Sequence, residues 1–308
     1  MARSVTWCVT GASGQLGGVL VRQLVEAGEE VVALSGRRTV QIAGVRTSPI
    51  DITDHQAVRR ILEQTRPSVV VHLAAVSSVG EALSDPKRAR QVNVDATDAL
   101  VALAGRVGAR LICASTDLVF DGQAPPYDES SCPDPVNCYG RSKFQAEPAV
   151  LNYGRGVVVR PSLMFGLPVV PRQTTFCQQL VALRDGRTLR LFEDEFRTPL
   201  WFEDAARAIR AIGRSDFVGL MHLAGPERTS RLDMGVAMAV ALGLPTDAIQ
   251  AVTSSSMSFP EPRPADVSLD GSLFERTFPD VCSARTVREA VAGIRPDELA
   301  GLAPGPSS

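Results

Sequence analysis

The feature that most constrains the fold is a glycine-rich turn that begins ten residues into the chain. It reads Thr10-Gly11-Ala12-Ser13-Gly14-Gln15-Leu16-Gly17. An apolar stretch at 5–10 predicts a buried strand before it, and the apolar spacing of 15–27 predicts a helix after it. Glycines at this spacing let backbone approach a diphosphate, and a helix N-terminus attracts anions. We therefore expect dinucleotide contacts from Gly11, Ser13, Gly14, Gln15 and Leu16; the alternative is a tight turn that binds nothing.

Strand-like and helix-like segments alternate through the first half of the chain. Further strands are predicted at 30–35, 69–73, 110–114 and 157–160, and helices at 54–65 and 89–107. Short apolar strands separated by helices indicate parallel pairing, because parallel strands need crossover connections and are covered on both faces. The sequence thus predicts an α/β fold with a doubly wound parallel Rossmann sheet.

The regular pattern weakens after about Pro161, where prolines become frequent. We expect 1–160 to form the cofactor-binding Rossmann domain and 161–308 to form a smaller C-terminal substrate lobe. A predicted helix at 202–212 and a strand at 219–223 indicate that part of this second half returns to the main sheet.

Composition excludes several classes of function. The 308 residues carry a net charge of −2, so no basic excess points to nucleic acid. No apolar run is long enough to span a bilayer, and we expect a cytoplasmic protein. The six cysteines are irregularly spaced without a CxxC pair, so we predict no metal site.

The end of the second predicted strand indicates the choice of cofactor. An NAD-selecting fold places an acidic residue there, but this chain has Ser35-Gly36-Arg37-Arg38. Two guanidiniums favour a 2′-phosphate, so we expect NADP(H) rather than NAD(H), with Arg37 and Arg38 as ligands. Further along, Asp51 and Ile52 are placed to meet the adenine, whereas Asp54 suits the cap of the next helix.

A proton-transfer site is predicted around a helix at about 138–152. Tyr139 and Lys143 are four residues apart and share a helix face, so the ammonium is expected to lower the pKa of the phenol. Thr116 and Asp117 follow the strand predicted at 110–114. They lie at the carboxyl end of that strand, where ligands bind in such sheets. Thr116 is placed to polarise a carbonyl; the alternative is that these residues only complete a turn.

Longer stretches resemble the dTDP-4-dehydrorhamnose reductase family of extended short-chain dehydrogenases/reductases. The family pattern is close to STDYVFDG…PYxE…PxNxYGxSK. This chain has STDLVFDG from Ser115, PYDE from Pro126 and PVNCYGRSK from Pro135. The resemblance continues to a segment beginning at Arg263, RPADVSLD, and covers about residues 5–295.

The resemblance implies reduction of the 4-keto group of a dTDP-deoxysugar by an NADPH hydride, with Tyr139 as proton donor. Lys143 would hold the nicotinamide ribose, and Thr116 the keto oxygen. Further family positions imply cofactor contacts from Leu73, Ala74, Ala75 and Asn93. Asp117, Arg197 and Arg263 are implied to contact substrate; for Arg197 a surface ion pair with Glu193, Asp194 or Glu195 is the alternative.

Two segments, PPYDE from Pro125 and RPSLMFG from Arg160, are also similar to a non-catalytic relative, the regulatory β subunit of methionine adenosyltransferase, which binds NADP and partners a catalytic subunit. A reductase of another carbonyl compound is a further alternative. The partner implied by the main resemblance is a nucleotide sugar, and a homodimer is one assembly it allows. Catalysis therefore has to be argued from the site itself.

Overall fold

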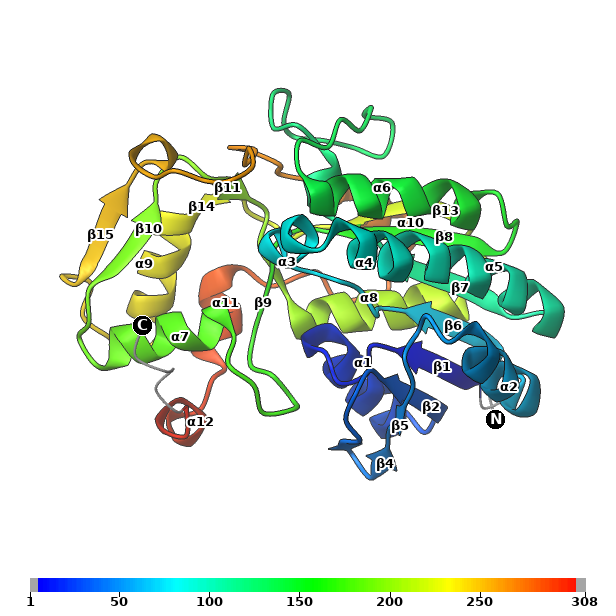
Figure 1. The fold of residues 1–308 in the computed structure, drawn as a ribbon. Helices are drawn as coiled ribbons and strands as arrows, with labels where there is room; N and C mark the ends of the chain where they lie inside the picture. The colour runs from blue at the N-terminus through cyan, green and yellow to red at the C-terminus, as the bar shows by residue number, and fades with distance from the viewer. Residues whose placement is uncertain (1–4, 303–308) are drawn as a thin grey trace.

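The computed structural model of the protein describes residues 5–302. Its central feature is a seven-stranded, wholly parallel sheet in the order β13-β8-β7-β6-β1-β2-β5 (Figure 1). The strands are β1 (Thr6–Thr10), β2 (Glu30–Ser35), β5 (Ser48–Pro49), β6 (Val69–His72), β7 (Arg110–Ala114), β8 (Gly156–Pro161) and β13 (Gly219–Leu223). The predicted doubly wound Rossmann sheet is confirmed.

Helices cover both faces of this sheet. One face carries α1 (Gln15–Glu26) and α8 (Phe202–Arg214), whose apolar side chains share a core with β1, β6 and β8. The other face carries α2 (His55–Thr65), α5 (Ala96–Val107) and α6 (Cys138–Leu151), with a second core. Asp54 caps α2 as expected, because its carboxylate accepts the N–H of Ala57 at 3.0 Å.

The helix predicted at 89–107 differs in the structure. It begins earlier, at α4 (Pro86–Arg90), continues through a π-helical turn (Gln91–Asp95) and ends as α5. Asp85 starts α4 by accepting the N–H of Arg88 at 2.9 Å, and Pro86 suits the first position because it lacks an N–H. A separate helix, α3 (Val79–Ser84), precedes α4.

A smaller lobe lies to one side of the sheet domain (Figure 1). Its parallel strand pair, β10 (Leu189–Phe192) and β15 (Ile249–Val252), packs with helices α7 (Thr175–Arg184), α9 (Arg231–Ala241) and α11 (Val287–Ala292). The remaining short elements are β3 (Gln41–Ile42), β4 (Val45–Arg46), β9 (Met164–Phe165), β11 (Phe196–Arg197), β12 (Leu200–Trp201), β14 (Thr229–Ser230), α10 (Ser272–Thr277) and α12 (Pro296–Ala300).

The chain passes between the two parts several times. After α7 and β10 it returns to the sheet as α8 and β13, and it then re-enters the lobe as α9. A second return brings Leu269 beside Tyr127 on the sheet domain before α11 packs in the lobe core. Within residues 5–302, no helix is both long and apolar enough to cross a membrane.

The glycine turn brings three stretches of backbone into contact. Gly11 has a left-handed φ of +68°, and a Cβ there would lie 2.7 Å from the amide nitrogen of Ala74 after β6. A Cβ on Gly17 would lie 2.2 Å from the carbonyl oxygen of Gly11. Both positions require glycine, because any side chain would push α1 away from β1 or β6.

We expect Gly17→Ala to lower the free energy of unfolding by about 1–3 kcal/mol, because the added methyl group overlaps backbone that cannot move freely. Urea denaturation measures the change. Gly80→Ala is the matched control, since a Cβ there has only the Ser78 hydroxyl within 4 Å, at 3.7 Å. Equal stability of the two variants would contradict the proposed packing role.

Candidate active site

A cavity of about 560 Å³ opens beside the glycine turn, at the carboxyl ends of β1, β2 and β6. Many of the residues predicted to contact a cofactor line it: Gly11, Ser13, Gly14, Arg37, Asp51, Ile52, Leu73, Ala74 and Ala75. Other predicted cofactor residues are not part of this lining: Gln15, Leu16, Arg38, Asn93, Tyr139 and Lys143. The glycine cradle, which a Cβ would fill, and the free first turn of α1 fit a dinucleotide diphosphate.

The floor of the cavity is tied together by one hydroxyl group. Thr10 Oγ1, at the end of β1, accepts the N–H groups of Leu73 and Ala74 at 3.2 Å each. It also lies 2.8 Å from Nδ1 of His72, a buried side chain whose pKa is lowered to about 3 by burial and by the charge of Lys143. His72 is therefore a neutral structural group at neutral pH.

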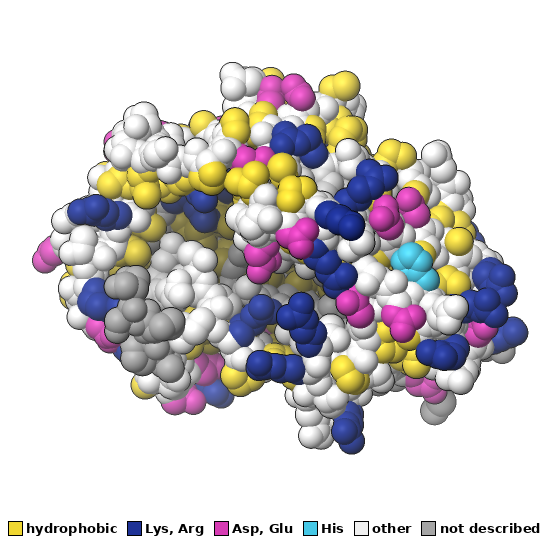
Figure 2. Space-filling view, viewed as in Figure 1, with side chains coloured by type: hydrophobic (Ala, Val, Ile, Leu, Met, Phe, Trp, Pro, Cys, Tyr) yellow, Lys and Arg dark blue, Asp and Glu magenta, His cyan; other side chains and the backbone are white. Residues whose placement is uncertain are grey.

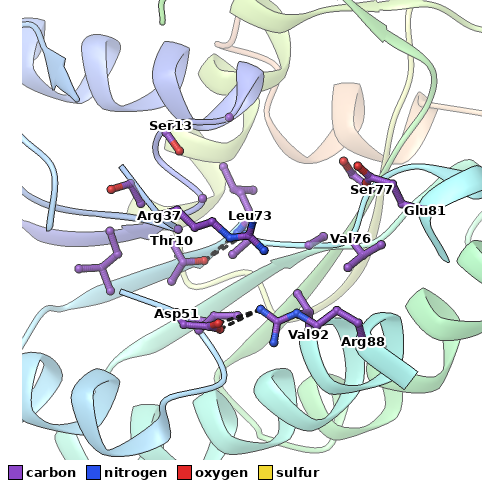
Figure 3. A pocket seen from close by; sticks show the side chains of 18 of the residues that line it. Thr10, Ser13, Arg37, Asp51, Leu73, Val76, Ser77, Glu81, Arg88 and Val92 are labelled. Atoms are coloured by element: carbon purple, nitrogen blue, oxygen red, sulfur yellow. Dashed lines mark hydrogen bonds and ion pairs between the residues drawn. The ribbon is translucent and has the colours of Figure 1, made fainter. Parts of the chain in front are cut away.

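Three arginines reach the cavity, and the sequence indicated only one of them. Figure 3 shows Arg37, from the end of β2, and Arg88, from α4, entering from opposite sides. Arg88 is held by Asp51 at 2.8 Å, so the carboxylate expected at the adenine is already paired. Arg172 lines the cavity from the loop after β9, whereas Arg38 is exposed and outside the lining. No sequence motif marks Arg88 or Arg172.

Asn93 is placed to support the site rather than to line the cavity. Its fully buried amide accepts the N–H of Val76 at 2.9 Å and donates to the Val76 carbonyl at 3.0 Å. It also donates to Oγ of Ser142 in α6 at 2.9 Å. Asn93 thus joins the cavity wall to the helix that carries Tyr139 and Lys143. Leu16, another predicted cofactor residue outside the lining, packs in the apolar core beneath α1.

Close packing sets the position of α6. Asn137 caps the helix by accepting the N–H of Gly140 at 2.8 Å. A Cβ on Gly140 would lie 2.1 Å from the carbonyl oxygen of Leu118, so the helix touches the turn that follows β7. This contact brings Tyr139 beside Thr116, while Lys143 is buried one turn further along α6.

The pKa of Tyr139 is shifted in the direction opposite to the one expected from the sequence. Burial, followed by the negative charge of Asp117, raises the pKa of the phenol, and a side-chain hydrogen bond with Thr116 only partly opposes this. The prediction that Lys143 lowers this pKa was wrong for the ligand-free protein, because desolvation penalises the phenolate most. Tyr139 is consequently a neutral phenol at physiological pH, which is the form that can donate a proton.

Asp117 lies between the tyrosine and the second lobe. It accepts the hydroxyl of Thr116 at 3.1 Å, while its buried Oδ2 has no hydrogen-bond partner among the described residues. Burial raises the pKa of its carboxyl group, and the guanidinium of Arg197, whose Nε lies 3.9 Å from Oδ2, opposes this.

The surface ion pair considered for Arg197 is wrong. The side chain is buried, and its guanidinium donates to the carbonyls of Phe196, Ala265 and Pro264 at 2.6–3.2 Å. These bonds fix β11 to the segment that returns from the second lobe. Because these carbonyls take up its N–H groups, Arg197 has few donors left to bind a substrate.

Two further arginines, Arg231 and Arg263, lie near Arg197 and Asp117. The sequence indicated only Arg263 as a candidate substrate ligand. Arg231, the first residue of α9, is half-buried; burial, followed by the charge of Arg197, lowers its pKa, while Glu195 and Asp117 oppose this. Nη1 of Arg263 lies 3.8 Å from the buried Oε1 of Glu195, which lacks a hydrogen-bond partner among the described residues. The guanidiniums of Arg197, Arg231 and Arg263 thus lie near the carboxylates of Asp117 and Glu195. Three positive groups near two negative ones leave an excess of positive charge.

Basic side chains also gather on one face of the molecular surface. Figure 2 shows Lys and Arg side chains gathered around a hollow near the middle of the face that it displays. Such a hollow, bordered by positive charge, favours an anionic ligand.

A buried ion pair holds the strand ends against α6. Glu147, one turn beyond Lys143, accepts Nε and Nη2 of Arg160 at 2.9 and 2.6 Å. Its Oε1 also accepts the hydroxyl of Ser115 at 2.5 Å. Because Ser115 precedes Thr116, the same carboxylate fixes the end of β7 and the face of α6.

Relatives of known name are similar to this chain over most of its length. A β subunit of methionine adenosyltransferase 2 from Xenopus laevis is 31% identical over 276 residues, covering 87% of this chain and 81% of that protein. A dTDP-4-keto-6-deoxy-D-glucose reductase from Streptomyces niveus is 32% identical over 262 residues, covering 84% and 86%.

Solved structures have the same fold. A dTDP-4-dehydrorhamnose reductase from Clostridium acetobutylicum superposes with a TM-score of 0.82 at 26% identity, over 93% of this chain and 97% of that one. A Bacillus anthracis dTDP-4-dehydrorhamnose reductase in complex with NADP gives 0.82 at 22% identity, over 94% and 98%. The profile of the RmlD substrate binding domain matches residues 6–295, and the chain therefore belongs to that family.

Proposed function

We propose that this protein is an NADPH-dependent reductase of a keto group, with the 4-keto group of a dTDP-deoxysugar as its substrate. The observation that carries the proposal is the protonated Tyr139 beside Thr116, on a helix that Asn93 joins to the wall of a cavity that fits a dinucleotide. Relatives named as dTDP-sugar reductases support the choice of substrate.

NADPH is the favoured cofactor because the end of β2 carries Arg37 and no carboxylate. The glycine turn and the first turn of α1 would hold the diphosphate, and Arg37 would bind the 2′-phosphate. The bound cofactor supplies the hydride.

The residues of the chain supply the proton and the orientation. As the carbonyl carbon gains the hydride, its oxygen becomes basic, and the phenol of Tyr139 donates a proton to it. The hydroxyl of Thr116 is placed to bind the same oxygen, and the resulting tyrosinate would be stabilised by the ammonium of Lys143. Before reaction, burial and Asp117 keep the tyrosine protonated.

The second lobe supplies the recognition of an anionic substrate. Arg231 and Arg263 remain the arginines best placed for this, because Arg197 is bonded to backbone carbonyls. A nucleotide sugar carries a diphosphate between nucleoside and sugar, and guanidiniums bind phosphate oxygens strongly.

The relatives named as β subunits of methionine adenosyltransferase 2 favour a second candidate, a dinucleotide-binding regulatory subunit. Only the reductase is expected to oxidise NADPH while it reduces a 4-keto sugar nucleotide. NADPH oxidation in the presence of dTDP-4-keto-6-deoxyglucose supports the reductase. Tight NADPH binding with no turnover of 4-keto sugar nucleotides would favour the regulatory subunit.

We expect Tyr139→Phe to lower kcat by about 10²–10⁴-fold, the usual contribution of a general acid. NADPH affinity should change little, because the phenol is not part of the cavity lining. Steady-state NADPH oxidation and fluorescence titration measure the two quantities. Tyr153→Phe is the control, since that hydroxyl bonds only the distant Ala109 carbonyl, at 2.7 Å. An unchanged kcat for Tyr139→Phe would remove the proton-donor assignment.

We expect Arg231→Ala to raise KM for the sugar nucleotide by about 10–100-fold, because a charge-assisted hydrogen bond contributes about 1.5–3 kcal/mol. The value of kcat should fall much less, and Arg231→Lys should recover part of the loss. Arg288→Ala, an exposed arginine of the same lobe, serves as the control. If KM is the same in the alanine variant and the wild type, the diphosphate is bound elsewhere.

A further inference from the structure

The loop between β9 and α7 connects the sheet domain to the second lobe and passes over the start of α1. A Cβ on Gly18 would lie 3.3 Å from Cβ of Val169 and 3.8 Å from Cγ2 of Val170. Both valines pack against the apolar core beneath α1. The loop is therefore seated on the helix turn that follows the glycine cradle.

The other end of the loop is fixed in the lobe. Thr174 is buried and caps α7, accepting the N–H of Cys177 at 3.0 Å. Arg172 lies between this cap and Val170. Its backbone is thus held on both sides, while its exposed side chain reaches the lining of the dinucleotide cavity.

The charge of Arg172 is unused in the ligand-free protein. Among residues 5–302 no hydrogen bond or ion pair joins its guanidinium to a partner, whereas Arg88 on the cavity wall is paired with Asp51. Arg37 projects from the end of β2, where the 2′-phosphate of the cofactor is expected. An unpaired cation held near the glycine cradle is suited to a second anionic group.

We propose that Arg172 binds the diphosphate of the dinucleotide from the side opposite the glycine turn, and thereby attaches the second lobe to the bound cofactor. The N–H groups of the turn reach one side of the diphosphate and leave its outer oxygens open to a guanidinium. This inference rests on the proposed dinucleotide site but not on the sugar substrate or on catalysis. The cofactor would then fix the side chain of Arg172, on the loop that leads into α7, before substrate arrives.

Binding measurements with two dinucleotides test the assignment. A diphosphate ligand should matter equally for NADPH and NADH, so Arg172→Ala should raise both dissociation constants about tenfold or more, the loss expected for a charge-assisted hydrogen bond. Arg37→Ala should weaken NADPH and spare NADH, because only NADPH carries the 2′-phosphate. Arg172→Lys should retain part of the affinity, and Arg190→Ala, an exposed arginine of the lobe, should match the wild type.

Cleavage by trypsin provides a second readout on the unaltered protein. Arg172 is exposed without cofactor, and NADPH should slow cleavage after this residue more than cleavage after Arg190. Dissociation constants within twofold of wild type for Arg172→Ala would overturn the proposal. A loss confined to NADPH would also overturn it, since Arg172 would then bind the 2′-phosphate. Wild-type protein that binds NADPH but reduces no keto sugar would remove the proposed reductase while leaving this test intact.

Discussion

The buried pair of Glu147 and Arg160 is the interaction on which the arrangement of the site depends. Each side chain is only 3% exposed, so both charges have lost nearly all of their water. That loss is offset only because the carboxylate takes two guanidinium bonds and the hydroxyl of Ser115 together. These bonds join α6 to the ends of β7 and β8. The distance between Thr116 and the face of α6 that carries Lys143 follows from them.

The ligand-free site is prepared for donating a proton rather than for accepting one. Burial and Asp117 favour the protonated phenol of Tyr139, whereas spacing on the helix alone suggested the opposite. A helical pattern shows that Tyr139 and Lys143 share a face, but the extent of desolvation depends on what packs above them. The close approach of Gly140 to Leu118, which places the start of α6 against the turn after β7, involves residues more than twenty positions apart.

The sequence predicted the parts of the structure that are local or strongly apolar. The strands at 30–35, 110–114 and 219–223 have the predicted bounds, because each is a continuous or alternating apolar run ending at turn residues. The strands of the second lobe were missed, since segments of two to four residues are too short to show a period. Arg88, Arg172 and Arg231 were missed for another reason: each reaches a site only through tertiary folding, and no motif surrounds it.

The repeated passage of the chain between the two parts limits how such a protein can diversify. Because α8 and β13 complete the sheet domain while α9 and α11 complete the lobe, neither part corresponds to one continuous stretch of sequence. Recombination of genes at a single junction therefore cannot exchange one lobe for another. New substrate preferences have to arise by substitutions and by changes of loop length within an intact chain, while the strand ends that hold the proton donor remain in place.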